Sequence, residues 1–124
     1  VIKEFTDKPF VMTGNDGKLH QVFLNIIANA VQAIPEKGEI KISTQIKENY
    51  LKIAITDNGL GIEKKHLSRI FDPFFTTKPP GKGTGLGLSI VNKILIEHKG
   101  HISVDSELGK GTTMNITLPI IKTL

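Results

Sequence analysis

The stretch LHQVFLNIIANAVQAI, residues 19–34, decides the fold because its apolar side chains recur with the period of an α-helix. Asn15 or Asp16 can cap the start of this helix, and Pro35 to Gly38 ends it. The apolar positions are Leu19, Val22, Phe23, Ile26, Ile27, Ala30, Val31 and Ile34. The sequence therefore predicts one long amphipathic helix that packs on a sheet.

Two amides, Asn25 and Asn29, fall one turn apart at the border between the apolar arc and the surface of this helix. Asn is a mediocre helix former, so a pair at this spacing suggests a ligand. A neutral amide oxygen suits Mg²⁺. The alternative, two solvated polar positions, stays open on these residues alone.

Alternating apolar and polar residues predict short strands elsewhere along the chain. A turn at Glu48-Asn49 joins two of them, and two further helices are predicted over Glu63 to Ile70 and Leu86 to His98, with Gly100 as the stop of the second. The strand patterns cover Ile2 to Phe5, Phe10 to Thr13, Ile40 to Ile46, Leu51 to Ile55, Ile102 to Val104 and Met114 to Leu118. This order predicts an α+β fold, a two-layer α/β sandwich. Its mixed, mostly antiparallel sheet has about five strands, with three helices on one face.

Asp57 ends a strand pattern and shares the inward face with Leu51, Ile53 and Ile55. A buried carboxylate needs a donor, and an adenine amine is a natural one. Gly59 and Gly61 then let the backbone turn tightly beside a flat ring. The alternative is an Asp that caps an ordinary turn, and both stay open.

Thr112 keeps the parity of Met114, Ile116 and Leu118, so its hydroxyl is expected to face inward and to support Asp57 or the base through water. The alternative is a strand residue satisfied by the backbone.

A glycine run, Gly81, Gly83, Gly85 and Gly87, begins within residues 71–84, which are predicted to be a loop, and leads into the helix at Leu86 to His98. Free N–H groups at such a helix start attract phosphate. The run is neither a P-loop nor a dinucleotide-binding fingerprint, because no strand feeds it and its spacing differs. A flexible linker is the alternative. Lys78 and Lys82 lie where an ammonium can meet phosphate, and a solvated loop charge is the alternative for either.

Composition excludes several classes of protein. The net charge of +4 is scattered and few aromatics accompany it, so no nucleic-acid surface is expected. Cys is absent, which fits a reducing compartment, and the His spacing gives no zinc site. The sequence contains no run of about 18 apolar residues, the length needed to span a membrane. The 124 residues are expected to form one domain, 1–124, of a longer protein, since the chain starts at Val1.

The order of these stretches resembles the ATP-binding catalytic domain, of the HATPase_c type and Bergerat-type fold, of the sensor histidine kinases of two-component systems. The resemblance covers nearly the whole chain. His20 to Ile34 looks like the N box, Asp57 to Ile62 the G1 box, Phe71 to Lys78 the F box and Gly83 to Leu88 the G2 box. The form Phe-Phe-Thr-Thr-Lys in the F box looks like that of nitrogen-regulation kinases.

The resemblance implies residue roles. Asn29 would coordinate Mg²⁺, Asp57 would read adenine and Lys78 would approach the terminal phosphates of ATP. Asn25 stands where related ATPases have a Glu that activates water, and an amide cannot act as that base. The implied catalytic residues are Asn25, Asn29 and Lys78, and the implied nucleotide-binding residues are Asn29, Asp57, Gly59, Gly61, Ile62, Phe75, Thr77, Lys78, Gly83, Thr84, Gly85, Leu86, Gly87, Leu88 and Thr112.

Two departures limit the resemblance. Gln32 and Ala33 stand where many kinases have a basic and an aromatic residue, so charge neutralisation would depend on the lysines of the glycine-rich segment. No His has the acceptor context. His20 is followed by Gln, and His98 lies in a last helical turn, where a positive charge is favoured. The acceptor is therefore expected on a separate dimerisation domain.

The resemblance thus implies a half-enzyme that binds Mg-ATP and donates the γ-phosphoryl to that histidine in a homodimeric parent protein, for relay to a response regulator. The domain is expected to be cytoplasmic and to contact neither nucleic acid nor membrane directly. Both a membrane-anchored and an unanchored parent protein are compatible with this expectation. The alternatives are an anti-sigma-type Ser/Thr kinase, a non-catalytic ATP-sensing module, and an ATPase clamp, against which Asn25 and the F box argue.

Overall fold

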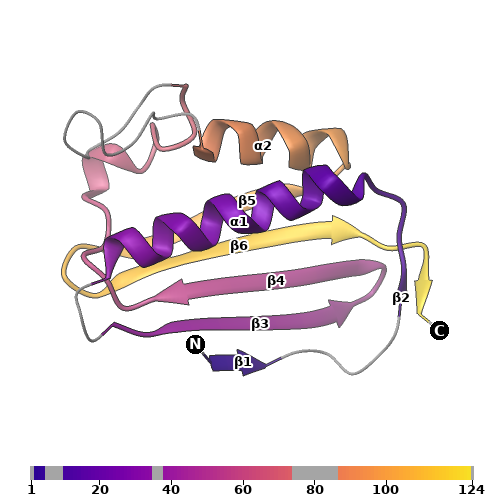
Figure 1. The fold of residues 1–124 in the computed structure, drawn as a ribbon, viewed down its shortest axis with the longest axis horizontal. Coiled ribbons are helices and arrows are strands. Elements are labelled where there is room, and N and C mark those ends of the chain that lie inside the picture. Colours follow the sequence, from indigo (N-terminus) through magenta and orange to yellow (C-terminus); the bar gives the residue numbers. More distant parts are fainter. Residues whose placement is uncertain (1, 5–9, 35–37, 74–86, 124) are drawn as a thin grey trace.

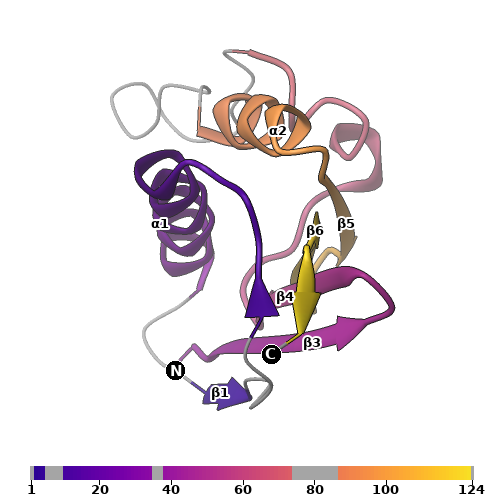
Figure 2. The same cartoon turned by 90° about the vertical axis from the view of Figure 1, so that its right-hand side faces the viewer.

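The structure is a computed structural model that describes residues 2–4, 10–34, 38–73 and 87–123. A five-stranded sheet forms one layer and two α-helices cover one of its faces (Figures 1 and 2). The strands lie in the order β1 (Ile2–Glu4), β3 (Ile40–Lys47), β4 (Tyr50–Asp57), β6 (Gly111–Pro119) and β5 (His101–Glu107). Only the β1–β3 pair of this sheet is parallel, so the prediction of a mixed, mostly antiparallel sheet is confirmed.

A two-stranded sheet outside this layer contains one predicted strand, at Phe10 to Thr13, and one strand that was not predicted. It pairs β2 (Phe10–Val11) with β7 (Lys122–Thr123) in antiparallel register, close to the start of α1 and the end of β6 (Figure 1). The strand that was missed, β7, has two residues, which are too few for alternation to be read from a sequence.

The long helix α1 (Asp16–Ala33) begins as predicted, because Asn15 Oδ1 accepts the N–H of Lys18 at 2.9 Å. Its buried residues are Val22, Ile26 and Ala30. Val31, however, is 54% exposed, so its predicted place in the apolar arc is wrong. It lies seven residues from Leu24, two turns along the same face, and Leu24 is 55% exposed.

The predicted third helix, Glu63 to Ile70, is wrong. The described residues contain two α-helices, α1 and α2 (Gly87–Glu97), and the segment after β4 holds only the 3₁₀ helix η1 (Lys64–His66). Its backbone bonds join residues three apart: His66 N to Glu63 O at 2.8 Å and Arg69 N to His66 O at 2.9 Å. This tighter pattern suits short connecting segments.

The hydrophobic core fills the space between the two layers. Alternation along β4 and β6 turns every second side chain toward the helices. The buried apolar residues are Val22, Ile26, Ala30, Ile40, Leu51, Ile53, Ile55, Ile70, Val91, Ile94, Leu95, Met114, Ile116, Leu118 and Ile120. Within the described ranges, no helix is long and apolar enough to cross a membrane.

His98 joins the end of α2 to the start of α1. Its Nε2 accepts the N–H of Asn15 at 2.9 Å and its Nδ1 lies 2.8 Å from the Ile94 carbonyl. Since Nε2 accepts, Nδ1 is the donor to that carbonyl in this arrangement. A Lys18–Glu97 ion pair at 3.0 Å lies beside it.

At the end of α2, the left-handed backbone conformation and the closest backbone contact occur at two neighbouring residues, Lys99 and Gly100. Lys99 takes the left-handed conformation at φ 60°, and the N–H of Gly100 bonds the Leu95 carbonyl at 2.8 Å, which is a Schellman cap. Gly100 is required by packing instead, because a Cβ there would collide with the Thr117 carbonyl. The predicted stop is thus in the right place, with the left-handed residue one position earlier.

Two neighbouring substitutions should therefore have opposite effects on stability. Lys99→Gly removes the left-handed strain and should raise the free energy of unfolding by about 0.5–1 kcal/mol. Gly100→Ala forces the Thr117 backbone to move and should lower it by about 1–3 kcal/mol. Urea unfolding measures both, and effects of the same sign would contradict this account of the helix end.

Candidate functional site

The carboxylate of Asp57 ends β4 on the inner face of the sheet and is 7% exposed. Its Oδ1 accepts the N–H of Gly59 at 2.9 Å, and the N–H of Thr112 is a second donor. The inward orientation predicted from alternation is confirmed. The alternative also holds in part, because the bond to Gly59 is an Asx turn.

Burial dominates the electrostatics of this carboxylate. Loss of solvent raises the pKa of Asp57 above its ordinary value, while the N–H groups of Gly59 and Thr112 lower it by less. The described donors to the carboxylate are thus neutral backbone groups. An ionised carboxylate has about four lone-pair directions, so it retains capacity for a further donor.

The turn after Asp57 lies between α1 and the β5–β6 connection. A Cβ at Gly59 would collide with the Ala33 carbonyl, which also accepts the N–H of Leu60 at 3.0 Å. Gly61 has φ 76°, and a Cβ there would collide with the Glu107 carbonyl. The predicted tight turn is confirmed, and protein backbone on both sides explains the two glycines.

The β5–β6 connection completes this arrangement from the other side. The N–H of Gly109 bonds the Leu60 carbonyl at 2.7 Å. Gly111 has φ 127°, and a Cβ there would collide with the Asp57 carbonyl. Close backbone contacts therefore fix the position of the carboxylate relative to the neighbouring strand.

Thr112 lies opposite Asp57 on β6 and is 7% exposed, so its predicted inward orientation is confirmed. Its hydroxyl lies 2.8 Å from that of Ser106, and its backbone N–H supports the carboxylate. The support predicted for Asp57 therefore comes from the backbone of Thr112.

Sequence reasoning missed Ser106, which lies on β5 opposite Thr112. Besides Thr112, its Oγ contacts Ile62 N at 2.8 Å and Gly111 O at 2.9 Å. The signal was present, because Ser106 continues the inward parity of Ile102 and Val104.

Asn25 and Asn29 are both half-buried on α1, so their predicted position at the border of the core is confirmed. Asn25 Nδ2 points to the carbonyl of Gly87 at 3.4 Å, which links α1 to the first residue of α2. Gly87 and Leu88 are half-buried, and Leu88 packs against the core. The remaining predicted site residues, Phe75, Thr77, Lys78, Gly83, Thr84, Gly85 and Leu86, lie outside the described residues, as does most of the predicted loop.

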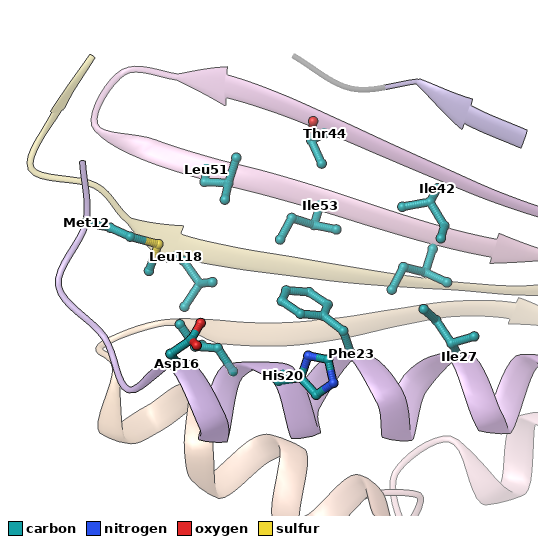
Figure 3. A pocket seen from close by; sticks show the side chains of 12 residues that line it. Met12, Asp16, His20, Phe23, Ile27, Ile42, Thr44, Leu51, Ile53 and Leu118 are labelled. Atoms are coloured by element: carbon teal, nitrogen blue, oxygen red, sulfur yellow. The ribbon is translucent and has the colours of Figure 1, made fainter. Parts of the chain in front are cut away.

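A cavity beside α1 does not coincide with these groups. About 510 Å³ lies between α1 and the strands β3 and β4, walled by apolar side chains such as Phe23, Ile27 and Ile53 (Figure 3). None of Asn25, Asn29, Asp57 and Thr112 lines it. An open hollow of about 390 Å³ includes Asp57 and Thr112, but residues from both sheet faces line it. The candidate site is therefore defined by its polar groups rather than by a cavity.

Comparisons with known proteins point to one family. The family described as histidine kinase-, DNA gyrase B- and HSP90-like ATPase matches residues 14–122. The signal transduction histidine-protein kinase AtoS of Escherichia coli (strain K12) is 50% identical over 103 residues, which are 82% of this chain and 17% of AtoS. Sporulation kinase E of Bacillus subtilis (strain 168) is 43% identical over 104 residues, 83% of this chain and 14% of that kinase.

Solved structures agree with the sequences. Full-length ShkA, solved in complex with AMPPNP, matches with a TM-score of 0.83 and 27% identity over 96% of this chain and 25% of ShkA. For eight of its curated relatives, the chain spans between 12% and 25% of the relative's length.

The family match covers the inward carboxylate, both helices and the four antiparallel strands. The chain therefore belongs to the family of histidine kinase-, DNA gyrase B- and HSP90-like ATPases, and within it to the ATP-binding catalytic domains of the histidine kinases of two-component systems.

Proposed function

We propose that this chain, as a single domain over residues 1–124, binds Mg-ATP and donates the γ-phosphoryl to a histidine on a separate dimerisation domain. The observation that carries the proposal is the buried Asp57 carboxylate, whose described donors are backbone N–H groups alone. The exocyclic amine of adenine is a donor of the kind that a buried carboxylate favours. The AMPPNP complex of ShkA supports a nucleotide as the ligand.

The donor set fits a magnesium ion held on the triphosphate. Asn29 offers a neutral amide oxygen, and Mg²⁺ commonly takes one or two protein oxygens together with phosphate oxygens. When bound, the ion neutralises charge on the phosphates. Lys78 and the glycines of residues 83–87 are proposed to hold the same phosphates through an ammonium and backbone N–H groups.

The side chain of Asn25 favours transfer to a nucleophile other than water. An amide accepts and donates hydrogen bonds but does not remove a proton from water. Phosphoryl transfer depends mainly on positioning and charge neutralisation, so an imidazole brought in line with the γ-phosphate suffices as the acceptor. Asn25 thus protects the triphosphate from hydrolysis until the acceptor domain docks.

The parent protein is proposed to be a homodimer that acts in the cytoplasm and passes the phosphoryl group to an aspartate of a response regulator. The names of AtoS and sporulation kinase E support a signalling role. The nitrogen-regulation subtype rests on the sequence Phe74-Phe-Thr-Thr-Lys78.

Two substitutions test the site. Asp57→Asn places an amide against the adenine amine, and Asn29→Asp adds negative charge beside the triphosphate, so each should reduce transfer to a supplied acceptor domain at least 100-fold. The measurement is radiolabelled transfer, with circular dichroism as the check on folding. Asp105→Asn, an exposed carboxylate on the outer face of the same sheet, is the matched control and should retain transfer. Wild-type rates in either site variant would refute the assignment.

The raised pKa of Asp57 predicts how stability depends on pH. In the absence of nucleotide, folding favours the protonated form of Asp57. Its contribution to the free energy of unfolding is therefore present below about pH 4, the ordinary pKa of Asp, and is lost as the pH rises through the raised pKa of Asp57. The free energy of unfolding of wild type, relative to Asp57→Asn, should therefore fall over that interval and then level.

Nucleotide should change this titration. An amine donor favours the ionised carboxylate, so saturating ADP should lower the pKa of Asp57, as followed by ¹³C NMR of its carboxyl. Tripolyphosphate, which has no base, is the control and should leave it unchanged. An equal effect of both ligands would argue against recognition of adenine by Asp57.

A third substitution tests the role of Asn25. Asn25→Glu supplies a carboxylate next to the start of α2 and should raise ATP hydrolysis without an acceptor, by about 10-fold or more. Asn25→Gln also lengthens the side chain but supplies no base, so it should not. Phosphate release is measured for both, and equal rates would overturn the argument from the missing base while leaving the nucleotide site intact.

A further inference from the structure

The Ser106 hydroxyl has three partners and one proton. Its Oγ lies 2.8 Å from Ile62 N, 2.9 Å from Gly111 O and 2.8 Å from Thr112 Oγ1. The carbonyl of Gly111 can only accept, so it takes the proton of Ser106. The amide of Ile62 can only donate. The hydroxyl of Thr112 is therefore the donor in its bond to Ser106.

This direction fixes what Thr112 offers on its remaining side. With its proton directed at Ser106, the Thr112 hydroxyl keeps only lone pairs for another partner. Thr112 is the register partner of Asp57, and both are buried on the inner face of the sheet. An ionised Asp57 also offers only lone pairs. The two side chains together form a surface that accepts hydrogen bonds and donates none.

We propose that Ser106 is a positioning residue that sets which nucleobase binds. Because Ser106 accepts the Thr112 proton, the Thr112 hydroxyl can only accept a hydrogen bond from the nucleobase. This inference rests on the proposed function. At position 6, a 6-amino purine presents a donor to such a surface, whereas a 6-keto purine presents an acceptor that finds no donor there. Without Ser106 as its acceptor, the Thr112 hydroxyl could rotate and donate its hydrogen bond to a keto oxygen.

The test compares ATP with inosine triphosphate, which has a keto group in place of the 6-amino group. Dissociation constants are measured by calorimetry for wild type and for Ser106→Ala. The ratio of the inosine triphosphate constant to the ATP constant should fall at least fivefold in Ser106→Ala, because Thr112 can then donate. Ser106→Thr keeps a hydroxyl on a strand position and should restore the wild-type ratio.

Two controls separate this role from a structural one. Ser103→Ala, on the outer face of the same strand, should leave the ratio unchanged. In a Thr112→Val background, Ser106→Ala should no longer change it, since no hydroxyl remains to reorient. Weaker binding of both nucleotides by the same factor would show that Ser106 only holds the loop, and would overturn the proposal.

Wild type alone provides a second measurement that does not depend on the folding of a variant. The Thr112 hydroxyl proton should exchange slowly and show a nuclear Overhauser effect to Ser106. Fast exchange would overturn the proposed direction. If wild type bound neither nucleotide, the proposed function would fail; if it bound ATP and the ratio stayed constant in Ser106→Ala, only the present inference would fail.

Discussion

The burial of one carboxylate at the end of β4 is the constraint on which the arrangement of this domain depends. An acid in that position is held by two backbone N–H groups, from the turn that follows it and from the neighbouring strand. Both donors require close approach of three chain segments, the end of α1, the turn at residues 58–61 and the β5–β6 connection. Glycine at the contact points makes that approach possible. The same geometry leaves lone pairs directed at the inner face, where a ligand with an amine fits.

The two-layer core supports this site on packed secondary structure. Side chains of α1, α2 and the inner face of the sheet pack together at the middle of the domain. At one end, His98 and the Lys18–Glu97 pair join the helices through short bonds. At the other end, Asn25 Nδ2 donates to the Gly87 carbonyl at 3.4 Å, which joins α1 to the first residue of α2.

Alternation and helical period predicted much of this domain because they follow directly from burial. Parity along two strands placed Asp57 and Thr112 correctly, and the period of residues 19–34 predicted α1. The failures have physical causes. The segment after β4 is too short for periodicity to distinguish an α-helix from 3₁₀ turns, and β7 has only two residues. Ser106 continues the inward parity of β5, but its bond to Ile62 joins segments 44 residues apart, which local patterns do not encode. The left-handed Lys99 was missed since glycine beside it is the usual candidate.

The glycine contacts around the carboxylate also bear on how genetic data for this domain are interpreted. Gly59, Gly61 and Gly111 each face a backbone carbonyl that a methyl group would strike. In a saturation mutagenesis screen for signalling, these positions would tolerate no replacement, and their scores would equal those of residues that touch nucleotide. Intolerance at these glycines therefore reports close backbone contact between chain segments. A map of nucleotide-binding residues drawn from such a screen would extend too far toward the β5–β6 connection.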